Sequence, residues 1–486
     1  MKSVLMATAE FSPFVKSGGL GDVVGALPFA LRKEGVDARV IMPLYSFIPA
    51  KVTESLKVVK ETVVNLGWRQ QYCGILEINY NGLPMYFIDS RYYYGGDKLY
   101  YDMESDIERF AFFNAAVLNA LPHIDFAPDI IHCHDWHTAL LPVIFHAHYK
   151  KMQFFGSIKT VLTIHNLKYQ GICGRQKLYD ILGIHDGYSV AASLHHGDNA
   201  ANCFKGGLSV ADKLTTVSDT YAREIRDPYY GEGLDWLLRW RGHDLVGIVN
   251  GIDSHSYDPS RDGQLVENYT VENAAQAKKA NKTALQAELG LDVDADRPVI
   301  AFISRLVAQK GIELITRVFD DIMAPLTDGT DRRPQFILLG TGDAQYEDDA
   351  RRVTDKYPHD AAARIAFDDG LARRIYAAAD FFLMPSLFEP CGISQLIAMR
   401  YGALPIVRET GGLSDTVAPY NEKTGEGNGY GFKNINAHDM LYTIRRALGI
   451  YAGAPEIHNA IVAEAMEGDY SWDQSARRYK ELYRFM

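Results

Sequence analysis

Long apolar runs, paired cysteines and an excess of positive charge are all missing from this sequence of 486 residues. No apolar run approaches the ~18 residues of a membrane-spanning helix, which predicts a chain without a membrane segment. The five cysteines form no CxxC pair, and their odd number without a leader peptide predicts reduced thiols and a cytoplasmic protein. The net charge of −11 argues against nucleic acid or an anionic membrane as the main partner.

The first residues superficially resemble a signal peptide, with Lys2 followed by the apolar residues 4–7. This apolar stretch is short and is followed at once by Glu10 and Pro13. The pattern therefore predicts a buried first strand rather than a secretion signal.

Two stretches have metal-ligand residue types without the matching geometry. Residues 132–137 read His-Cys-His-Asp-Trp-His, but they continue a predicted strand, in which alternate side chains face opposite ways. Residues 292–296 resemble the start of a calcium loop, yet Arg297 replaces the required glycine and Ile303 the closing glutamate. We expect no metal site.

Strand-like runs alternate with helical patterns along the whole chain, which predicts parallel, doubly wound α/β sheets. The length favours two large domains, expected at residues 1–249 and 250–460, with Asn250-Gly251-Ile252-Asp253 as a turn suited to a hinge. A last segment, 461–486, is expected to pack back on the first domain through an apolar stripe of Trp472, Ala476, Tyr479 and Tyr483.

The individual elements follow from the same patterns. Residues 267–290 predict an exposed, charged helix capped by Gly290. The predicted strands are 4–9, 38–42, 75–80, 85–88, 130–134, 161–165, 214–217 and 247–249 in the first half, and 299–304, 336–340, 365–367, 381–385 and 404–407 in the second.

One phrase occurs twice, once in each half. Residues 16–24 read Lys-Ser-Gly-Gly-Leu-Gly-Asp-Val-Val, and residues 409–417 read Glu-Thr-Gly-Gly-Leu-Ser-Asp-Thr-Val. Each follows an apolar run and precedes a potential helix, which is the unit that offers backbone N–H groups to an anion. A tight Gly-Gly turn is the simpler interpretation of one copy. Two copies favour two similar α/β domains that face one cleft.

Polar residues in the second half follow predicted strands. Arg305 and Lys310 precede a helical segment, where two cations oppose the helix dipole unless an anion binds there. A glycine-rich turn follows at 340–342, and Glu389 stands before another helix. Solvated basic residues and a dipole-complementing acid are the alternative interpretation. Together these residues favour a diphosphate site next to a carboxylate that can accept hydrogen bonds from sugar hydroxyls.

At these residues the chain resembles the glycogen and starch synthases, retaining glucosyltransferases with two Rossmann-like domains facing a deep cleft, the GT-B architecture. The resemblance implies transfer of glucose from ADP-glucose or UDP-glucose to the non-reducing 4-OH of an α-1,4-glucan, with no cofactor and no metal. The matching stretches cover nearly the whole chain in family order: 16–22, 134–140, 163–166, 249–253, 304–311, 386–395 and 410–417.

The resemblance also implies roles for single residues. Arg305 and Lys310 correspond to the diphosphate binders, and Glu389 to the residue that holds the donor glucose. Lys16, Gly18 and Gly19 correspond to the phosphate loop of the first domain. The implied sugar-side positions are Asp22, Asp135, His165 and Asn250, and the implied donor site also includes Gly340, Phe367, Cys391, Gly392 and the backbone N–H groups of Ile393 and Ser394.

The chain departs from the family pattern at Ser17, at Ile393-Ser394 and at Phe367, where tyrosine is frequent. Phe367 keeps an aromatic face for a base without the hydroxyl, which leaves the choice between ADP-glucose and UDP-glucose open. Ile397 stands where many other GT-B enzymes have a second glutamate, which disfavours the group related to sucrose synthase. Another nucleotide-sugar enzyme of this fold, such as an epimerase or a phosphorylase, and a non-catalytic glucan-binding relative are the remaining alternatives.

Overall fold

The computed structural model describes residues 2–326 and 331–486. The chain divides into two compact units, one made of Met1–Asn250 and Trp472–Met486 and the other of Gly251–Ser471. Each unit has a hydrophobic core of its own. The segment 461–486 is thus shared between them: α19 (Pro455–Glu467) belongs to the second unit and α20 (Trp472–Arg484) to the first.

The first unit is built on a sheet of nine strands in the order β12-β11-β7-β6-β1-β2-β5-β4-β3. Its strands are β1 (Ser3–Ala7), β2 (Asp37–Pro43), β3 (Lys57–Leu66), β4 (Arg69–Tyr80), β5 (Leu83–Asp89), β6 (Ile130–His134), β7 (Lys159–Ile164), β11 (Lys213–Thr216) and β12 (Leu245–Gly247); a small separate sheet contains β8 (Ile172–Gly174), β9 (His195–His196) and β10 (Ala200–Asn202).

The helices of the first unit include two long ones, α1 (Gly19–Lys33) and α4 (Met103–Ala120). The others are α2 (Ala50–Thr53), α3 (Arg91–Tyr94), α5 (Leu140–Ile144), α6 (Arg175–Leu182), α7 (Ala191–Leu194), α8 (Cys203–Val210), α9 (Asp219–Glu224) and α10 (Asp235–Trp240), with short irregular turns at η1 (Leu121–His123), η2 (Trp136–Thr138), η3 (Phe145–Tyr149) and η4 (Gln153–Phe155).

Seven strands of this sheet are parallel, as predicted, but β4 pairs antiparallel with both β5 and β3. Strand β3 was not predicted, because most of its residues are exposed and show no clean alternation of apolar and polar types. A buried parallel strand such as β1 reads instead as a continuous apolar run, which is why it was predicted.

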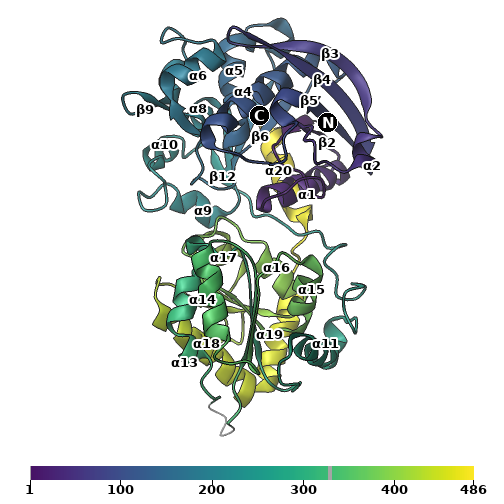
Figure 1. The fold of residues 1–486 in the computed structure, drawn as a ribbon, viewed down its shortest axis with the longest axis vertical. Helices are drawn as coiled ribbons and strands as arrows, with labels where there is room; N and C mark the ends of the chain where they lie inside the picture. Colours follow the sequence, from purple (N-terminus) through teal and green to yellow (C-terminus); the bar gives the residue numbers. More distant parts are fainter. Residues whose placement is uncertain (1, 327–330) are drawn as a thin grey trace. The chain divides into compact units, whose positions relative to one another are not determined.

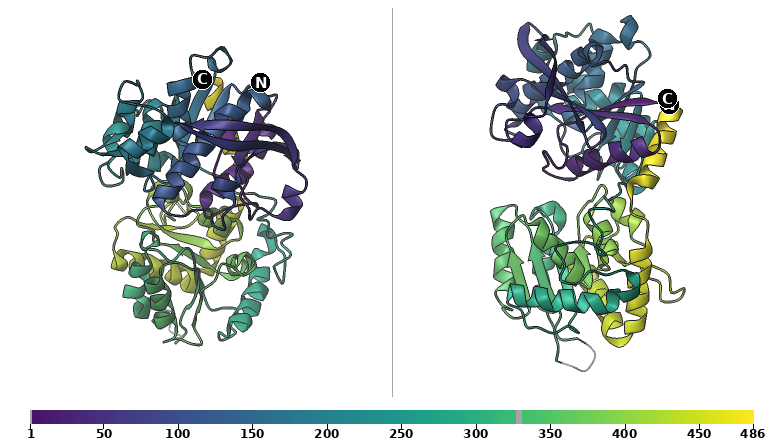
Figure 2. Two further views of the ribbon diagram at one scale, coloured as in Figure 1. Left: turned by 45° about the horizontal axis from the view of Figure 1, so that its top comes forward. Right: turned by 90° about the vertical axis from the view of Figure 1, so that its right-hand side faces the viewer.

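The last helix of the chain, α20, completes the first unit. It packs beside α1, so that the two ends of the sequence lie side by side (Figures 1 and 2). All four members of its predicted stripe are buried: Trp472, Ala476, Tyr479 and Tyr483. The Tyr483 hydroxyl lies 2.7 Å from Nδ1 of His132 on β6, which ties the helix to the centre of the sheet.

The second unit has a fully parallel sheet in the order β15-β14-β13-β16-β17-β18, with helices on both faces (Figure 1). Its strands are β13 (Val299–Ile303), β14 (Gln335–Leu339), β15 (Ala361–Arg364), β16 (Phe381–Met384), β17 (Leu404–Arg408) and β18 (Tyr430–Phe432). Its helices are α11 (Ala274–Leu289), α12 (Ile312–Arg317), α13 (Phe319–Ile322), α14 (Ala344–Thr354), α15 (Asp369–Ala378), α16 (Ser394–Arg400), α17 (Gly411–Thr416), α18 (Ala437–Gly453) and α19, with turns at η5 (Val271–Asn273) and η6 (Ala308–Lys310).

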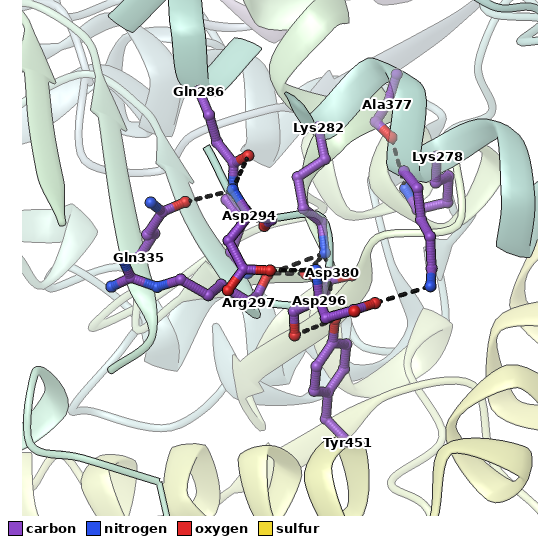
Figure 3. A network of polar contacts seen from close by, with 12 residues as sticks. Lys278, Lys282, Gln286, Asp294, Asp296, Arg297, Gln335, Ala377, Asp380 and Tyr451 are labelled. Carbon is purple, nitrogen blue, oxygen red and sulfur yellow. Dashed lines mark hydrogen bonds and ion pairs between the residues drawn. The ribbon is translucent and has the colours of Figure 1, made fainter. Parts of the chain in front are cut away.

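Two predictions for this unit need correction. The strand expected at 365–367 is wrong, because β15 ends at Arg364 and the apolar residues after it lie in a loop. Helix α11 ends where predicted, with Gly290 in the left-handed conformation at φ 77°. It is not an exposed helix, however, because it packs against α15 and its Lys278 and Lys282 (Figure 3) are buried.

Candidate functional site

In the second unit, the loops that follow β13 and β16 contact each other. Arg305 is the second residue after the end of β13; its side chain is exposed and forms no hydrogen bond or ion pair with any described residue. Lys310 ends the short turn η6 and is followed by Gly311 at φ 73°. A Cβ atom on Gly311 would lie 2.1 Å from the Pro385 carbonyl oxygen, so only glycine permits this approach of the two loops.

The close approach places Lys310 against Glu389. Lys310 Nζ lies 2.6 Å from Oε2 of Glu389, and the Ser386 hydroxyl donates to the same oxygen at 3.0 Å. Both charged side chains are largely buried, with 16% and 8% of their surface exposed. A buried ion pair of this kind leaves strong donors and acceptors in fixed positions.

Other side chains hold the loop that carries Glu389. Arg408, at the end of β17, donates to the Ser386 and Leu387 carbonyl oxygens. Gln309 donates from its side chain to the Phe388 carbonyl oxygen and accepts the Leu387 N–H. The Glu389 loop is therefore fixed by neighbours from two strand ends.

The second copy of the Gly-Gly phrase braces this loop, which corrects one expectation. The Gly412 N–H donates to the carbonyl oxygens of Glu389 and Pro390, so it is not free to bind an anion. A Cβ on Gly411 or on Gly412 would lie about 2 Å from a main-chain oxygen of the Glu389 loop, at 1.9 and 2.2 Å respectively. The two glycines permit close packing of backbone on backbone.

The remaining donor-site candidates of this unit surround the same loops. Gly340 is required by close packing, since its Cβ would lie 1.9 Å from the Ser304 carbonyl oxygen. Cys391 is buried and Gly392 has φ 75°. Ile393 is the N-cap of α16 and Ser394 its first residue, where backbone N–H groups lack helical acceptors.

Phe367 is not part of this packed group. It lies in the loop between β15 and α15, and 84% of its surface is exposed. The aromatic face that the sequence analysis assigned to a nucleotide base is thus accessible to solvent.

In the first unit, the phrase at residues 16–24 opens a long helix. Gly18 is the N-cap of α1 and Gly19 its first residue, so the helix start predicted by the sequence is present. A Cβ on Gly18 would meet no atom within 4 Å. Lys16 and Asp22, predicted as separate site residues, form an ion pair at 3.0 Å, and each side chain is more than a third exposed.

Glu10, which was not predicted as a site residue, organises this loop. Its carboxylate is only 2% exposed and accepts hydrogen bonds from the N–H and the hydroxyl of Ser17, both at 2.7 Å, and from the Tyr100 hydroxyl at 2.5 Å. The available signal was its position: an acidic residue soon after the first buried strand, at the edge where α/β proteins bind ligands.

Asp135 and His165 lie together at the carboxyl ends of β6 and β7. Asp135 Oδ1 accepts the N–H groups of His165 and Asn166 at 2.8 and 3.2 Å. Asp135 has φ 58° and ψ −174°, a region that non-glycine residues avoid and that is typical of strained functional positions. Burial raises the pKa of Asp135 to about 7, although the two backbone N–H groups oppose this shift.

The histidines of this region are neutral. Burial lowers the pKa of His165 to about 3 and holds that of His134 well below its usual value. His134 Nδ1 lies 3.0 Å from His165 Nε2, so one ring donates and the other accepts. Both ring nitrogens of His132 have partners, the hydroxyls of Tyr483 and Thr163. Within residues 2–326 and 331–486, no group of three His, Cys, Asp or Glu side chains is arranged to hold a metal ion.

Asn250 is the last residue of the first unit before the chain enters the second. It is 6% exposed, and its buried Oδ1 has no hydrogen-bond partner among the described residues. An unpaired buried amide oxygen costs free energy unless a ligand group or water donates to it.

At the carboxyl ends of its strands, the second unit combines the exposed guanidinium of Arg305, the largely buried Lys310–Glu389 ion pair and several glycine-containing loops. Such an arrangement can bind a diphosphate and a sugar hydroxyl side by side. The first unit adds a helix start with a lysine and a buried, strained aspartate next to neutral imidazoles. All five cysteines of the chain are free thiols. No helix of the described residues is both long and apolar enough to span a membrane.

Comparison with known proteins connects these clusters to one family. Residues 3–240 match the family model of the starch synthase catalytic domain, and residues 289–456 match glycosyl transferases group 1. The glycogen synthase of Clostridium novyi (strain NT) is 48% identical over 482 residues, which cover 99% of this chain and 98% of that protein. The glycogen synthase of Geobacillus thermodenitrificans (strain NG80-2) is also 48% identical, over 99% of this chain and 97% of the relative.

Solved structures agree with this. The catalytic domain of starch synthase IV from Arabidopsis thaliana, bound to ADP and acarbose, superposes with a TM-score of 0.88 at 32% identity, covering 100% of this chain and 99% of that one. A sucrose-phosphate synthase from Thermosynechococcus elongatus, at 18% identity and a TM-score of 0.62, shares the fold. With such relatives over nearly its whole length, the chain belongs to the glycogen and starch synthase family of glucosyltransferases with the GT-B fold.

Proposed function

We propose that this protein transfers glucose, with retention, from ADP-glucose to the non-reducing 4-OH of an α-1,4-glucan. One observation carries the proposal: the exposed Arg305 and the Lys310–Glu389 pair follow the carboxyl ends of the neighbouring parallel strands β13 and β16. The choice of ADP-glucose is supported by the Arabidopsis starch synthase, whose structure contains ADP and acarbose. The five free thiols support action in the cytoplasm.

In this proposal the second unit binds the donor. Arg305 and Lys310 hold the diphosphate, and Glu389 accepts hydrogen bonds from hydroxyls of the donor glucose. The backbone N–H groups at the start of α16, around Ile393 and Ser394, add to the phosphate site. Phe367 offers its exposed ring to the base, and the glycines at 340 and 392 permit close approach of the loops.

The chemical step requires stabilisation of the leaving nucleoside diphosphate. As the bond between glucose and diphosphate breaks, negative charge grows on the diphosphate oxygens, and the basic side chains stabilise it. The acceptor hydroxyl attacks from the side on which the diphosphate leaves, and a diphosphate oxygen takes its proton. Retention of configuration follows from attack on that face.

We further propose that Lys16, with the helix start at Gly18 and Gly19, acts in the same reaction on the transition state. Asp22, Asp135, His165 and Asn250 then bind sugar hydroxyls. The neutral state of His165 suits hydrogen bonding to uncharged hydroxyls, and the unpaired Oδ1 of Asn250 needs a donor.

The test is a measurement of initial rates with ADP-glucose and with UDP-glucose, each with a maltooligosaccharide acceptor. We expect chain elongation by α-1,4-linked glucose and a higher kcat/KM with ADP-glucose. The Glu389→Gln variant serves as the matched control, because it keeps the size of the side chain and removes its charge. Faster transfer from UDP-glucose would contradict the donor assignment, and no elongation with either donor would contradict the proposed function.

A further inference from the structure

His134, the last residue of β6 in the first unit, is a buried polar residue that the proposed reaction does not use. None of its surface is exposed. Its backbone is fixed by the Thr138 hydroxyl, which accepts its N–H at 2.6 Å and donates to its carbonyl oxygen at 2.9 Å. Burial holds the pKa of its imidazole well below the usual value, so the ring is neutral. A polar ring inside a protein costs free energy unless hydrogen bonds replace those to water, so its presence needs a reason.

The ring of His134 contacts the ring of His165. Nδ1 of His134 lies 3.0 Å from Nε2 of His165. The other nitrogen of His134, Nε2, is buried and has no hydrogen-bond partner among the described residues. The face of the ring stacks on His132, with centroids 4.3 Å apart. Within the described part of the chain, the polar contact that this buried imidazole gains is therefore the one to His165.

His165 follows β7 directly and is held by two consecutive residues. The Asp135 carboxylate accepts its backbone N–H at 2.8 Å, and His134 contacts its side chain. In the parallel register of β6 and β7, His134 lies opposite Thr163, which brings the end of β6 beside the residue that leaves β7. His165 is half-buried, and its Nδ1 forms no hydrogen bond with any described residue. Nδ1 is thus the nitrogen that remains for a ligand.

The contact between the two rings also bears on their protons. A neutral imidazole has one N–H donor and one acceptor nitrogen, so two arrangements of the pair are possible. A proton on Nε2 of His134 would leave a buried N–H without an acceptor among the described residues. The other arrangement leaves an unpaired lone pair, and buried acceptors are left unpaired more often than buried donors. This favours a proton on Nδ1 of His134, donated to Nε2 of His165, and a proton on Nδ1 of His165.

We propose that His134 is a positioning residue, which holds the ring of His165 and its tautomer so that His165 presents an Nδ1–H donor to a sugar hydroxyl oxygen. The inference rests on the proposed function, in which His165 binds a sugar hydroxyl. The hydrogen bond at one nitrogen of a histidine decides which nitrogen carries the proton. A ring that is already held also loses less entropy when the ligand binds.

The tautomer is tested by NMR on the ligand-free full chain, with ¹⁵N-labelled histidine, near neutral pH. The ¹⁵N shifts of a neutral ring show which nitrogen is protonated, and the signals of His165 are those that disappear in His165→Gln. We expect a proton on Nδ1 and none on Nε2. A His165 ring protonated on Nε2, or one that exchanges between both forms, would overturn the proposal.

Two variants separate the hydrogen bond from the packing of the ring. His134→Asn places an amide NH₂ group close to the position of Nδ1 and can still donate, so the tautomer of His165 should persist. His134→Phe keeps a ring against His132 but has no nitrogen, so His165 should populate both tautomers. An unchanged His165 spectrum in His134→Phe would show that the contact does not set the tautomer.

Initial rates of glucose transfer provide the functional readout. His134→Phe should lower kcat/KM by about tenfold, roughly the loss of one hydrogen bond, and His134→Asn should recover most of it. Full activity of His134→Phe, or no recovery in a folded His134→Asn, would contradict the positioning role. If the wild type shows the expected tautomer but transfers no glucose, the proposed function fails while the arrangement of the two rings stands.

His132 provides the matched control. It is equally buried on the same strand and stacks on His134, but its ring nitrogens contact the hydroxyls of Tyr483 and Thr163. His132→Phe should therefore lower the thermal stability and leave the tautomer of His165 unchanged. If His132→Phe altered the His165 signals as much as His134→Phe does, general loosening of the core would explain both results and the proposal would fail.

Discussion

Each unit has a Gly-Gly loop arranged around a buried glutamate, but the two glutamates have different partners. In the first unit, Glu10 accepts hydrogen bonds only from neutral donors, the Ser17 N–H and two hydroxyls. In the second, Glu389 pairs with the Lys310 ammonium at 2.6 Å. The first carboxylate fixes the shape of a loop, whereas the second belongs to a charged pair that a ligand can rearrange.

The glycines differ in the same way. Gly18 has open space where a side chain would begin, whereas Gly412 packs against the main chain of Cys391. One sequence phrase thus serves as an accessible helix start in one unit and as a brace beneath a functional loop in the other. Similar sequences therefore do not imply similar contacts, and equivalent substitutions in the two loops test this difference.

The largest effect is expected for the two glutamates. Glu389→Gln should lower turnover by about 10²-fold or more, because the charged acceptor next to the proposed donor sugar is lost. Glu10→Gln should change turnover by only a few fold, because Ser17 and Tyr100 keep one acceptor oxygen and their hydroxyls can reorient. Initial rates and circular dichroism of both variants provide the comparison. Equal losses of activity in two folded variants would contradict it.

The basic residues of the two units should separate binding from catalysis. Arg305→Ala is expected to weaken ADP binding by tenfold or more, about the value of one hydrogen bond to a charged group. Lys16→Gln should depress kcat strongly and change ADP affinity little, since a residue that acts on the transition state affects turnover more than binding.

Calorimetry with ADP beside initial rates distinguishes the two variants. Loss of ADP binding in Lys16→Gln as severe as that in Arg305→Ala would show that no such division exists.

The glycines give a smaller contrast in stability. Gly412→Ala places a Cβ 2.2 Å from the Cys391 carbonyl oxygen, and we expect a loss of about 1–3 kcal/mol from overpacking. Gly18→Ala meets no atom within 4 Å and has extended backbone at φ −174°, so its effect should stay within about 0.5 kcal/mol. Thermal unfolding followed by circular dichroism measures both. A destabilised Gly18→Ala variant would show that the first loop is packed as tightly as the second.

The sequence predicted the parallel strands and the twin loops because these depend on local patterns. Buried strands such as β13 read as apolar runs, and Gly-Gly after such a run marks a helix start. The edge strand β3 is mostly exposed, has no continuous apolar run and was missed. The site residues were predicted from their positions after strands and from the family resemblance. The ion pairs that they form with one another were not predicted.

That Lys16 contacts Asp22, and Lys310 contacts Glu389, depends on side-chain packing that no spacing rule contains. Glu10 was missed for the same reason, since its hydrogen bonds come from Ser17 and Tyr100, which lie 7 and 90 positions away along the chain. The buried lysines of α11 were wrongly placed at the surface because composition alone suggested a solvated helix.

The last contrast concerns the pH dependence of stability at Asp135, another buried acid of the first unit. Like Glu10, it is held by neutral donors, and burial raises its pKa to about 7. In the unfolded chain an aspartate titrates near ~3.9, so between these values the folded state binds more protons than the unfolded state. The contribution of Asp135 to stability is therefore fully present below the unfolded pKa and is lost as the pH rises towards 7.

Asp135→Asn removes this titration while its amide oxygen can still accept the N–H groups of His165 and Asn166. Asparagine also tolerates positive φ better than most residues, so the backbone at φ 58° should persist. We expect the free energy of unfolding of the wild type to fall relative to that of the variant by at most about 1.4 kcal/mol per pH unit between about pH 4 and 7. Chemical denaturation across this range measures the difference. Parallel curves for wild type and variant would mean that Asp135 is ionised at its ordinary pKa.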